Sequence, residues 1–255
     1  MRAIDLNSDI GESDDPAQIA REEGLMAVVT SVNVACGVHA GSPALMRRMI
    51  RAAHARGVTV GAHPGFPDRA HGGRRELPLP PDEIERLVAE QVRALVAAAR
   101  EEGAACAHVK PHGGLYGLAA KDRAVAEAVV HAVASVDRGL RIIGFAGSHL
   151  IAAGRDAGLA VGEEGFADRG YASGGYLIPR GQPGALLTDA ADVTERALRL
   201  VREQVVATID GARLPVRADT ICVHGDTPQA DRLARAIRAS LEAAQVLIRP
   251  LSVHA

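Results

Sequence analysis

Short apolar runs alternate with longer amphipathic segments along the whole chain. The apolar runs are rich in β-branched residues and predict strands at about 2–8, 28–36, 58–62, 105–110, 141–146, 159–164 and 219–224. In the segments between them, apolar residues recur at the spacing of one helix face. This regular alternation of strands and helices predicts a mainly parallel sheet wrapped by helices.

The amphipathic segments carry the start and stop signals of helices. GSPALMRRMIRAAHARG offers Ser42 as the N-cap, Pro43 at the first helical position and Gly57 just past the end. A second segment, PPDEIERLVAEQVRALVAAAREEG, begins with prolines and acidic residues and stops at a glycine. No Pro/Gly/Ser-rich linker and no change of composition divides the chain, so we predict a single domain over residues 1–255.

Polar residues occupy one face of five predicted strands. Successive side chains of a strand point to opposite faces, so Asp5, Asn7 and Asp9 share one face and Ile4 and Leu6 share the other. The same division gives the polar faces of the other four strands as Ser31 and Asn33; Thr59, Gly61 and His63; His108, Lys110 and His112; and Thr220, Cys222, His224 and Asp226.

This division favours a closed (β/α) barrel over an open sheet. A sheet covered by helices on both faces shows continuous apolar runs, whereas a barrel turns one face of every strand inward. The charged residues lie toward the carboxyl ends of the strands, where barrel enzymes build their sites. The alternative is that they are solvated residues at strand ends.

Four histidines follow apolar runs beside or near glycine, namely His39, His63, His112 and His224. Gathered at one barrel mouth, they would suit proton transfer near neutral pH or metal coordination. Asp9, His63 and His112 are the expected ligands if a divalent metal, Mg²⁺ or another ion, is present. The metal signal is weak, because HExxH is absent and a strand separates His108 from His112 by roughly 13 Å.

Lys110 ends an apolar run in a chain whose only other lysine is Lys121. Facing inward, it must either pair with a carboxylate or have a lowered pKa. Unpaired, it would serve as a base, a Schiff-base amine or an anchor for a substrate carboxylate. Paired with Asp5 or Asp9, it would be structural.

Two long irregular stretches, 63–80 and 164–187, interrupt the pattern of short connections. Loops of this length inside a compact domain are usually functional. They contain Arg74, Arg75 and Arg169, which are candidates for clamping a carboxylate or a phosphate. The alternative for each is an arginine in solvent.

Composition and missing motifs exclude several classes of function. The net charge is −2 with both signs interspersed, so neither a nucleic-acid face nor a polybasic membrane anchor is expected. No apolar run reaches the ~20 residues of a membrane span, and the N-terminal run is too short for a signal peptide. The chain lacks GxxxxGK[ST], GxGxxG and GxSxG, which argues against a P-loop, a dinucleotide site and a hydrolase serine.

The three cysteines are Cys36, Cys106 and Cys222, and they lie far apart inside apolar runs. Their odd number and spacing indicate reduced thiols of a cytoplasmic protein, not a disulfide framework or a zinc site.

Eight sequence blocks together resemble the LamB/YcsF family of 5-oxoprolinase A subunits. They are DLNSDIGE (5–12), NVACGVHAG (33–41), GAHPGFPD (61–68), GRRE (73–76), VKPHGGLY (109–116), EGFADRGY (164–171), LIPR (177–180) and CVHGD (222–226). They appear in the order of the family and are spread across nearly the whole chain, and the combination is highly specific.

The resemblance implies an imperfect seven-stranded (β/α) TIM-like barrel, similar to the barrels of glycoside hydrolases and deacetylases, with a link to carbohydrate metabolism. It also implies ATP-dependent cleavage of 5-oxo-L-proline to L-glutamate together with two partner subunits, B and C. If ATP is used, either it binds without a Walker loop or a partner subunit holds it.

Carried over motif by motif, the resemblance implies two groups of site residues. The catalytic group is Asp9, His63, Lys110 and His112, and the substrate-binding group is Asn33, His39, Glu164, Arg169, His224 and Asp226. Three departures are Ser42 where the family has an aspartate after HAG, RAHGGRR before the arginine block, and a glycine-rich GGLYG.

Two other functions fit the same barrel. One is a metal-dependent amidase or carbohydrate deacetylase, which the Asp and His residues suggest. The other is a non-enzymatic barrel that binds a small metabolite and regulates a partner complex.

Overall fold

Seven parallel strands close into a barrel in the computed structural model, which describes residues 2–223 and 230–251. The barrel strands are β1 (Ala3–Ile10), β2 (Ser31–Ala35), β3 (Thr59–His63), β4 (Cys106–Val109), β5 (Arg141–Phe145), β6 (Val161–Phe166) and β9 (Thr220–Cys222). They pair in this order, and β9 returns to pair with β1. The predicted seven-stranded (β/α) barrel is confirmed.

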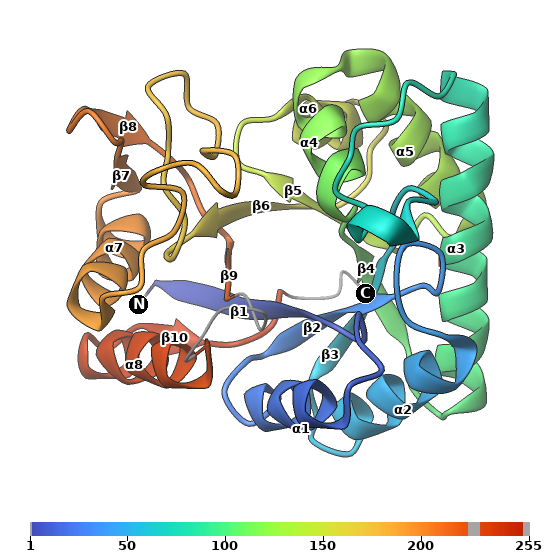
Figure 1. Ribbon diagram of the computed structural model, residues 1–255, viewed down its shortest axis with the longest axis horizontal. Helices are drawn as coiled ribbons and strands as arrows, with labels where there is room; N and C mark the ends of the chain where they lie inside the picture. Colours follow the sequence, from blue (N-terminus) through green and yellow to red (C-terminus); the bar gives the residue numbers. More distant parts are fainter. Residues whose placement is uncertain (1, 224–229, 252–255) are drawn as a thin grey trace.

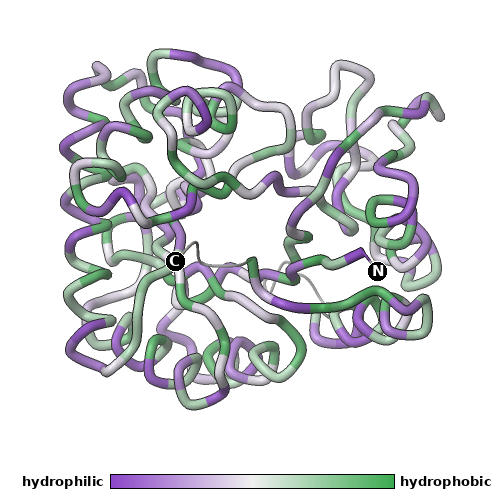
Figure 2. Tube along the Cα trace, turned by 180° about the vertical axis from the view of Figure 1, so that it is seen from behind, coloured by the Kyte–Doolittle hydropathy of each residue, from purple (hydrophilic) through white to green (hydrophobic). Residues whose placement is uncertain are grey.

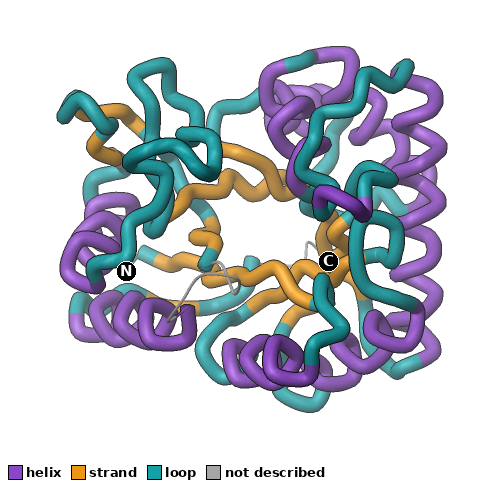
Figure 3. Tube along the Cα trace, in the orientation of Figure 1, coloured by secondary structure: helices purple, strands orange, loops and turns teal. Residues whose placement is uncertain are grey.

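Helices surround this ring of strands (Figures 1 and 3). They are α1 (Pro16–Leu25), α2 (Pro43–His54), α3 (Pro81–Glu101), α4 (Gly113–Lys121), α5 (Arg123–Val136), α6 (His149–Asp156), α7 (Ala190–Arg202) and α8 (Ala230–Ala243), with a short 3₁₀ turn, η1 (Arg69–His71). An antiparallel hairpin of β7 (Val205–Ala207) and β8 (Arg213–Pro215) follows α7, and β10 (Leu247–Ile248) pairs with the start of β1.

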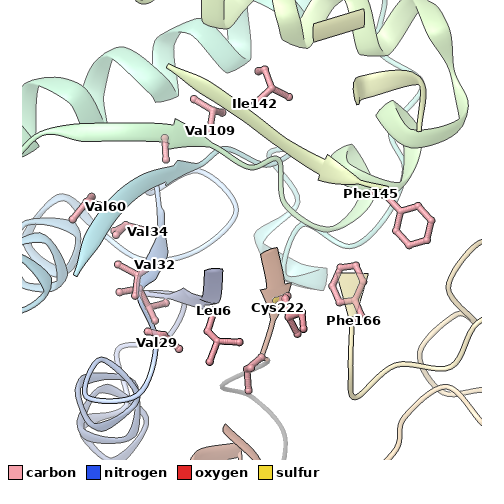
Figure 4. Packing of buried hydrophobic residues seen from close by; sticks show 14 of the residues in the cluster. Leu6, Val29, Val32, Val34, Val60, Val109, Ile142, Phe145, Phe166 and Cys222 are labelled. Atoms are coloured by element: carbon pink, nitrogen blue, oxygen red, sulfur yellow. The ribbon is translucent and has the colours of Figure 1, made fainter. Parts of the chain in front are cut away.

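The hydrophobic core lies between the strands and the helices. The outward side chains of the strands, such as Val34, Val60 and Val109, are at most 1% exposed (Figure 4). Hydrophobic and hydrophilic residues alternate along both the helices and the strands (Figure 2), as expected for elements that turn one face to this core. Burial of this apolar layer, at about 25 cal/mol per Å² of area, is the main favourable term that holds each helix on the barrel.

Strand bounds differ from the prediction where buried apolar residues belong to turns. Val28 and Val29 are buried, but both backbone N–H groups donate to the Leu25 carbonyl at the end of α1, so β2 begins at Ser31. Strand β6 begins later than expected and extends to Phe166. Hydropathy alone does not distinguish a buried turn from a buried strand.

Register inside the barrel aligns the polar face into a layer. Asp9 lies opposite Asn33, Asn33 opposite Gly61, and Gly61 opposite His108. Gly61 leaves room for the His108 ring, since a Cβ at this position would lie 2.0 Å from His108 Nε2. The predicted inward orientation of this parity is therefore confirmed for these strands.

None of the helices within residues 2–223 and 230–251 combines the length and the apolar character needed to cross a membrane.

Ser42 caps α2 as predicted, and it gives a test of the departure from the family's aspartate. Its hydroxyl accepts a hydrogen bond from the Leu45 backbone N–H at 3.2 Å. We expect Ser42→Ala to lower the free energy of unfolding by about 1 kcal/mol, because the N–H loses its acceptor. Urea denaturation measures this loss.

Ser42→Asp is the matched control and should stay close to the wild-type stability, because aspartate caps equally well. Equal destabilisation by both substitutions would contradict a capping role for Ser42.

Candidate active site

A cavity of about 840 Å³ opens at the carboxyl ends of the barrel strands. Its floor includes Asp9, His63 and Lys110, which stand at the ends of β1, β3 and β4. Both long irregular stretches contribute to its wall, through Arg74 from the first and Ile178 from the second. The volume is within the range of small-molecule sites.

Lys110 lies at the centre of a buried ionic network. The side chain is 3% exposed, and its Nζ lies 3.0 Å from Asp9 Oδ1 and 2.8 Å from Glu164 Oε1. Nζ also donates to Asn7 Oδ1 at 3.2 Å and contacts the Cys222 sulfur at 3.2 Å. The lysine is therefore paired, with Asp9 and Glu164 and not with Asp5.

This pairing decides between the roles considered for the lysine. Burial alone would lower the pKa of Lys110, but Asp9, followed by Cys222 and Glu164, raises that pKa well above its usual value. The side chain is consequently an ammonium ion near neutral pH, which argues against a free-amine base or a Schiff-base amine. An electrostatic or anchoring role agrees with this charge.

Asn7, Asn33 and Tyr116 hold the two carboxylates in place. Glu164 accepts from Asn7 Nδ2 at 2.9 Å and from the Tyr116 hydroxyl at 2.7 Å. Asn33 Nδ2 donates to Asp9 Oδ1 at 2.8 Å, and Asn33 Oδ1 faces His108 Nε2 at 2.7 Å. These amide and hydroxyl groups fix where the negative charges lie around the cavity floor.

Three of the four predicted histidines meet beside this network. The rings of His39 and His112 stack in parallel with centroids 4.0 Å apart, and His63 packs edge-on at 4.8 Å from His112. All three residues are at most 6% exposed. His224 and Asp226 lie outside the described residues, so their predicted places in the site remain predictions.

Backbone carbonyls fix the tautomers of His63 and His112. His63 Nδ1 donates to the Lys110 carbonyl at 2.7 Å, and His112 Nε2 donates to the Gly72 carbonyl at 2.8 Å. A carbonyl only accepts, so in the neutral rings the other nitrogen of each is the one with the lone pair. These two nitrogens, His63 Nε2 and His112 Nδ1, lie 3.0 Å apart.

Glu12 joins the two histidines, and sequence reasoning did not assign it to the site. Its Oε1 lies 3.0 Å from His112 Nδ1 and 3.7 Å from His63 Nε2. Gly11, at φ 76°, turns the chain after β1, and its N–H donates to the buried Glu22 of α1 at 2.9 Å. The alternation of side chains between the two faces of a strand stops at this turn, so it does not predict where Glu12 points. The only sequence signal for Glu12 is its place in the DLNSDIGE block.

Electrostatics in the cluster depend on Glu12. Burial would raise the pKa of Glu12, but the neighbouring His112, with smaller contributions from His39 and His63, holds that pKa well below its usual value. Burial would lower the pKa of His112, and Glu12 reverses this and raises it. Burial lowers the pKa of His39 to about 4, so its ring is neutral.

The suggested metal ligands regroup in the structure. Among the described residues, one group of His, Cys, Asp and Glu side chains has its possible ligand atoms within 4.8 Å of one another. This group is Glu12, His63 and His112. Asp9 Oδ2 lies 3.5 Å from His63 Nε2, and Asp9 Oδ1 is held by Lys110. His108 is hydrogen-bonded to Asn33 and does not belong to this group.

The loop arginines have different surroundings. Arg75 binds Asp68 through two hydrogen bonds of 2.7 and 3.0 Å and so stabilises its own loop. Arg169 is 7% exposed and donates to the carbonyls of Ala185 and Ile178, so part of its guanidinium holds the second loop together. Arg74, Arg169 and Arg180 all line the cavity.

Comparison with known proteins identifies relatives over the whole chain. The profile of the LamB/YcsF family matches residues 4–255. A protein from Chloroflexus aggregans, named as the A subunit of 5-oxoprolinase, is 50% identical over 249 residues, which cover 98% of this chain and 99% of the relative. One of the same name from Methylococcus capsulatus is 48% identical over 250 residues, covering 98% and 96%.

Solved structures with a similar fold include one relative of high sequence identity. A lactam utilization protein from Thermus thermophilus superposes with a TM-score of 0.90 at 43% identity, covering 98% of this chain and 100% of that one. A family 4 carbohydrate esterase from Streptomyces lividans gives a TM-score of 0.51 at 10% identity, covering 98% and 93%. The second likeness is one of fold alone.

Lys110 gives the test of the buried network. We expect Lys110→Met to lower the free energy of unfolding by about 3–5 kcal/mol, because it leaves the Asp9 and Glu164 carboxylates without their shared cation. The double variant Lys110→Met/Glu164→Gln should recover part of this loss. Chemical denaturation of the single and double variants measures both effects.

Lys121 provides the matched control, because it pairs with Glu76 at the surface and is 48% exposed. Lys121→Met should cost at most about 1 kcal/mol. A Lys110→Met protein as stable as Lys121→Met would contradict the network.

Proposed function

Because the chain belongs to the LamB/YcsF family, we propose that it is the A subunit of an ATP-dependent 5-oxoprolinase. In this proposal it opens the ring of 5-oxo-L-proline to give L-glutamate, with ATP hydrolysis, in a complex with two partner subunits, B and C. The observation that carries the proposal is the shared name of relatives that match this chain end to end. The lactam utilization protein of the same fold supports it.

Chemistry explains why ATP is needed. A five-membered lactam is a stable amide, because its carbonyl carbon is a weak electrophile and its ring nitrogen is a poor leaving group. Attack of the lactam oxygen on the γ-phosphorus of ATP forms an O-phosphorylated ring and releases ADP. Water then adds to the activated ring carbon and loses a proton, the ring nitrogen leaves with a proton as the amine, and a second water hydrolyses the resulting acyl phosphate to glutamate and phosphate.

Asp9 is the proposed general base. Its Oδ1 is fixed by Lys110 and Asn33, while Oδ2 lies on the cavity floor 3.5 Å from His63 Nε2. A carboxylate held in one orientation is suited to take the proton of an attacking water. His63 and His112 stand next to this position and are the other candidates for proton transfer.

Cationic side chains of the cavity are proposed to stabilise the negative charge of the substrate and of the transition state. The Lys110 ammonium lies beside Asp9 and faces the cavity, so it is placed to stabilise negative charge that develops on the substrate. Arg74, Arg169 and Arg180 line the wall and are the proposed partners of the substrate carboxylate or of a transferred phosphoryl group.

We propose that the complex uses ATP together with a divalent ion such as Mg²⁺, and that the partner subunits take part in the reaction. A small lactam fills only part of an 840 Å³ cavity, and the remaining space suits the phosphorylated substrate or a segment of a partner. A cytoplasmic location agrees with the free thiols of Cys36, Cys106 and Cys222.

The alternative of a carbohydrate deacetylase has less support. It rests on the Asp and His residues of the cavity and on a barrel likeness at 10% identity, and fold does not determine function, whereas the relatives that match end to end carry the name of a 5-oxoprolinase subunit. No observation favours a link to carbohydrate metabolism over lactam chemistry.

A reconstitution assay tests the proposed function. Purified chain, partner subunits, 5-oxoproline and ATP should give glutamate and ADP in equal amounts, and omission of this chain should abolish glutamate formation. Glutamate production that continues without this chain would contradict the proposal.

Asp9→Asn tests the base within the same assay. The substitution keeps the size of the side chain but removes the proton acceptor, so we expect kcat to fall by about 10²–10⁴-fold. Asp14→Asn, at an exposed position that does not line the cavity, is the control and should leave kcat unchanged. Equal kcat values for the two variants would exclude Asp9 as the base.

A further inference from the structure

The side chains of Glu12, His63 and His112 each direct one nitrogen or oxygen atom at a common point, and when both rings are neutral no hydrogen atom lies between these atoms. The backbone partners of both rings already take the ring N–H groups, as described above. The remaining atoms are His63 Nε2, His112 Nδ1 and Glu12 Oε1, which in neutral rings and an ionised carboxylate all carry lone pairs. Three acceptors at contact distance repel one another unless a cation lies between them.

We propose that Glu12, His63 and His112 bind one divalent zinc-like metal ion at the cavity floor. Two imidazole nitrogens and one carboxylate oxygen are a donor set that borderline divalent ions, and Zn²⁺ in particular, prefer. The site differs from the one the sequence suggested, because Glu12 takes the place of Asp9.

The spacing of the three atoms matches this ion. They are separated by 3.0, 3.0 and 3.7 Å. In a tetrahedral zinc site with bonds of about 2.0–2.1 Å, ligand atoms lie about 3.3 Å apart, so the observed triangle holds an ion with little movement of the side chains.

The surroundings have the features of a supported metal site. Histidine ligands of metals usually donate their second N–H to a carbonyl or carboxylate, and both rings do so here. All three ligand residues line the cavity, so an ion held by them would be next to the space for substrate. Three protein ligands with an open position are typical of catalytic sites, whereas structural zinc sites have four.

A separate observation points to the same place. Among the described residues, the buried side-chain oxygen and nitrogen atoms without a hydrogen-bond partner are Ser8 Oγ, Glu12 Oε1 and both ring nitrogens of His39. His39 is 1% exposed, stacks on His112, and its Nε2 lies 3.6 Å from Glu12 Oε1. Buried polar groups without partners are rare; of these atoms, Glu12 Oε1 is a proposed ligand and His39 Nε2 lies next to it.

A proton is the competing occupant. An extra proton on His112 Nδ1 would also separate the three acceptors, by giving one N–H between Glu12 and His63. The two occupants differ in what they require: the proton needs no metal, and the ion requires His112 Nδ1 to be without hydrogen.

Metal binding by the isolated full chain is the test, and it uses neither lactam nor ATP. The chain is purified without a histidine tag, stripped with a chelator, and dialysed against micromolar Zn²⁺ before elemental analysis. We expect the wild type to retain an equimolar amount of Zn²⁺ and to melt at a higher temperature with Zn²⁺ than without it. Co²⁺ in its place should give visible d–d absorption bands of a tetrahedral site.

Three variants and one control variant sharpen the result. Glu12→Gln and His63→Gln keep the side-chain volume close to the original and should lose both the bound Zn²⁺ and the shift in melting temperature. His39→Ala should retain binding but weaken it about 10–100-fold, because His39 only supports the ligands. His71→Ala is the control: this exposed histidine of the neighbouring loop pairs with Asp68, and its loss should change nothing.

Two results would overturn the proposal. One is Zn²⁺ retention by the wild type no greater than by Glu12→Gln. The other is an NMR spectrum in which His112 Nδ1 still carries its proton in excess Zn²⁺. Because the test involves no catalysis, a failure here would leave the proposed 5-oxoprolinase activity standing, and a failed activity assay would leave the metal site standing.

Discussion

The positive charge of Lys110 inside the barrel is the constraint on which the rest of the structure depends. A buried ammonium costs several kcal/mol unless carboxylates and hydrogen-bond acceptors compensate it. The compensation comes from Asn7 and Asp9 of β1, Glu164 of β6 and Cys222 of β9. These side chains reach Lys110 only when the strands close with their carboxyl ends in a common register. Closure of the barrel and the charge at the cavity floor therefore depend on each other.

Sequence patterns predicted the architecture because strand parity has a simple geometric cause. The alternation of Asp5, Asn7 and Asp9 with Ile4 and Leu6 requires one face toward helices and one toward the interior. Local signals such as the Ser42 cap were equally readable. Bounds were less accurate, since Val28 and Val29 are as apolar as strand residues but end a helix.

The candidate site was less predictable, because its contacts join segments far apart in sequence and lie in turns. Glu12 follows a glycine with positive φ, where parity gives no direction. Tyr116 reaches Glu164 from the first turns of α4, across 48 residues. Arg75 and Arg169 are residues of the type that binds anionic ligands, yet each uses hydrogen bonds to hold its own loop in place. Only the folded arrangement separates these roles.

Barrel closure also determines when the chain can fold during synthesis. β1 is made before the other barrel strands, but its partners β9 and β10 come from residues 220–222 and 247–248, so one edge of β1 stays unpaired until those residues have been made. Unpaired strand edges in incomplete chains are templates for association with other chains. The nascent protein thus depends on the segment from β9 to β10 to protect its first strand, and truncation at the C-terminus removes that protection before it removes any group described at the cavity floor.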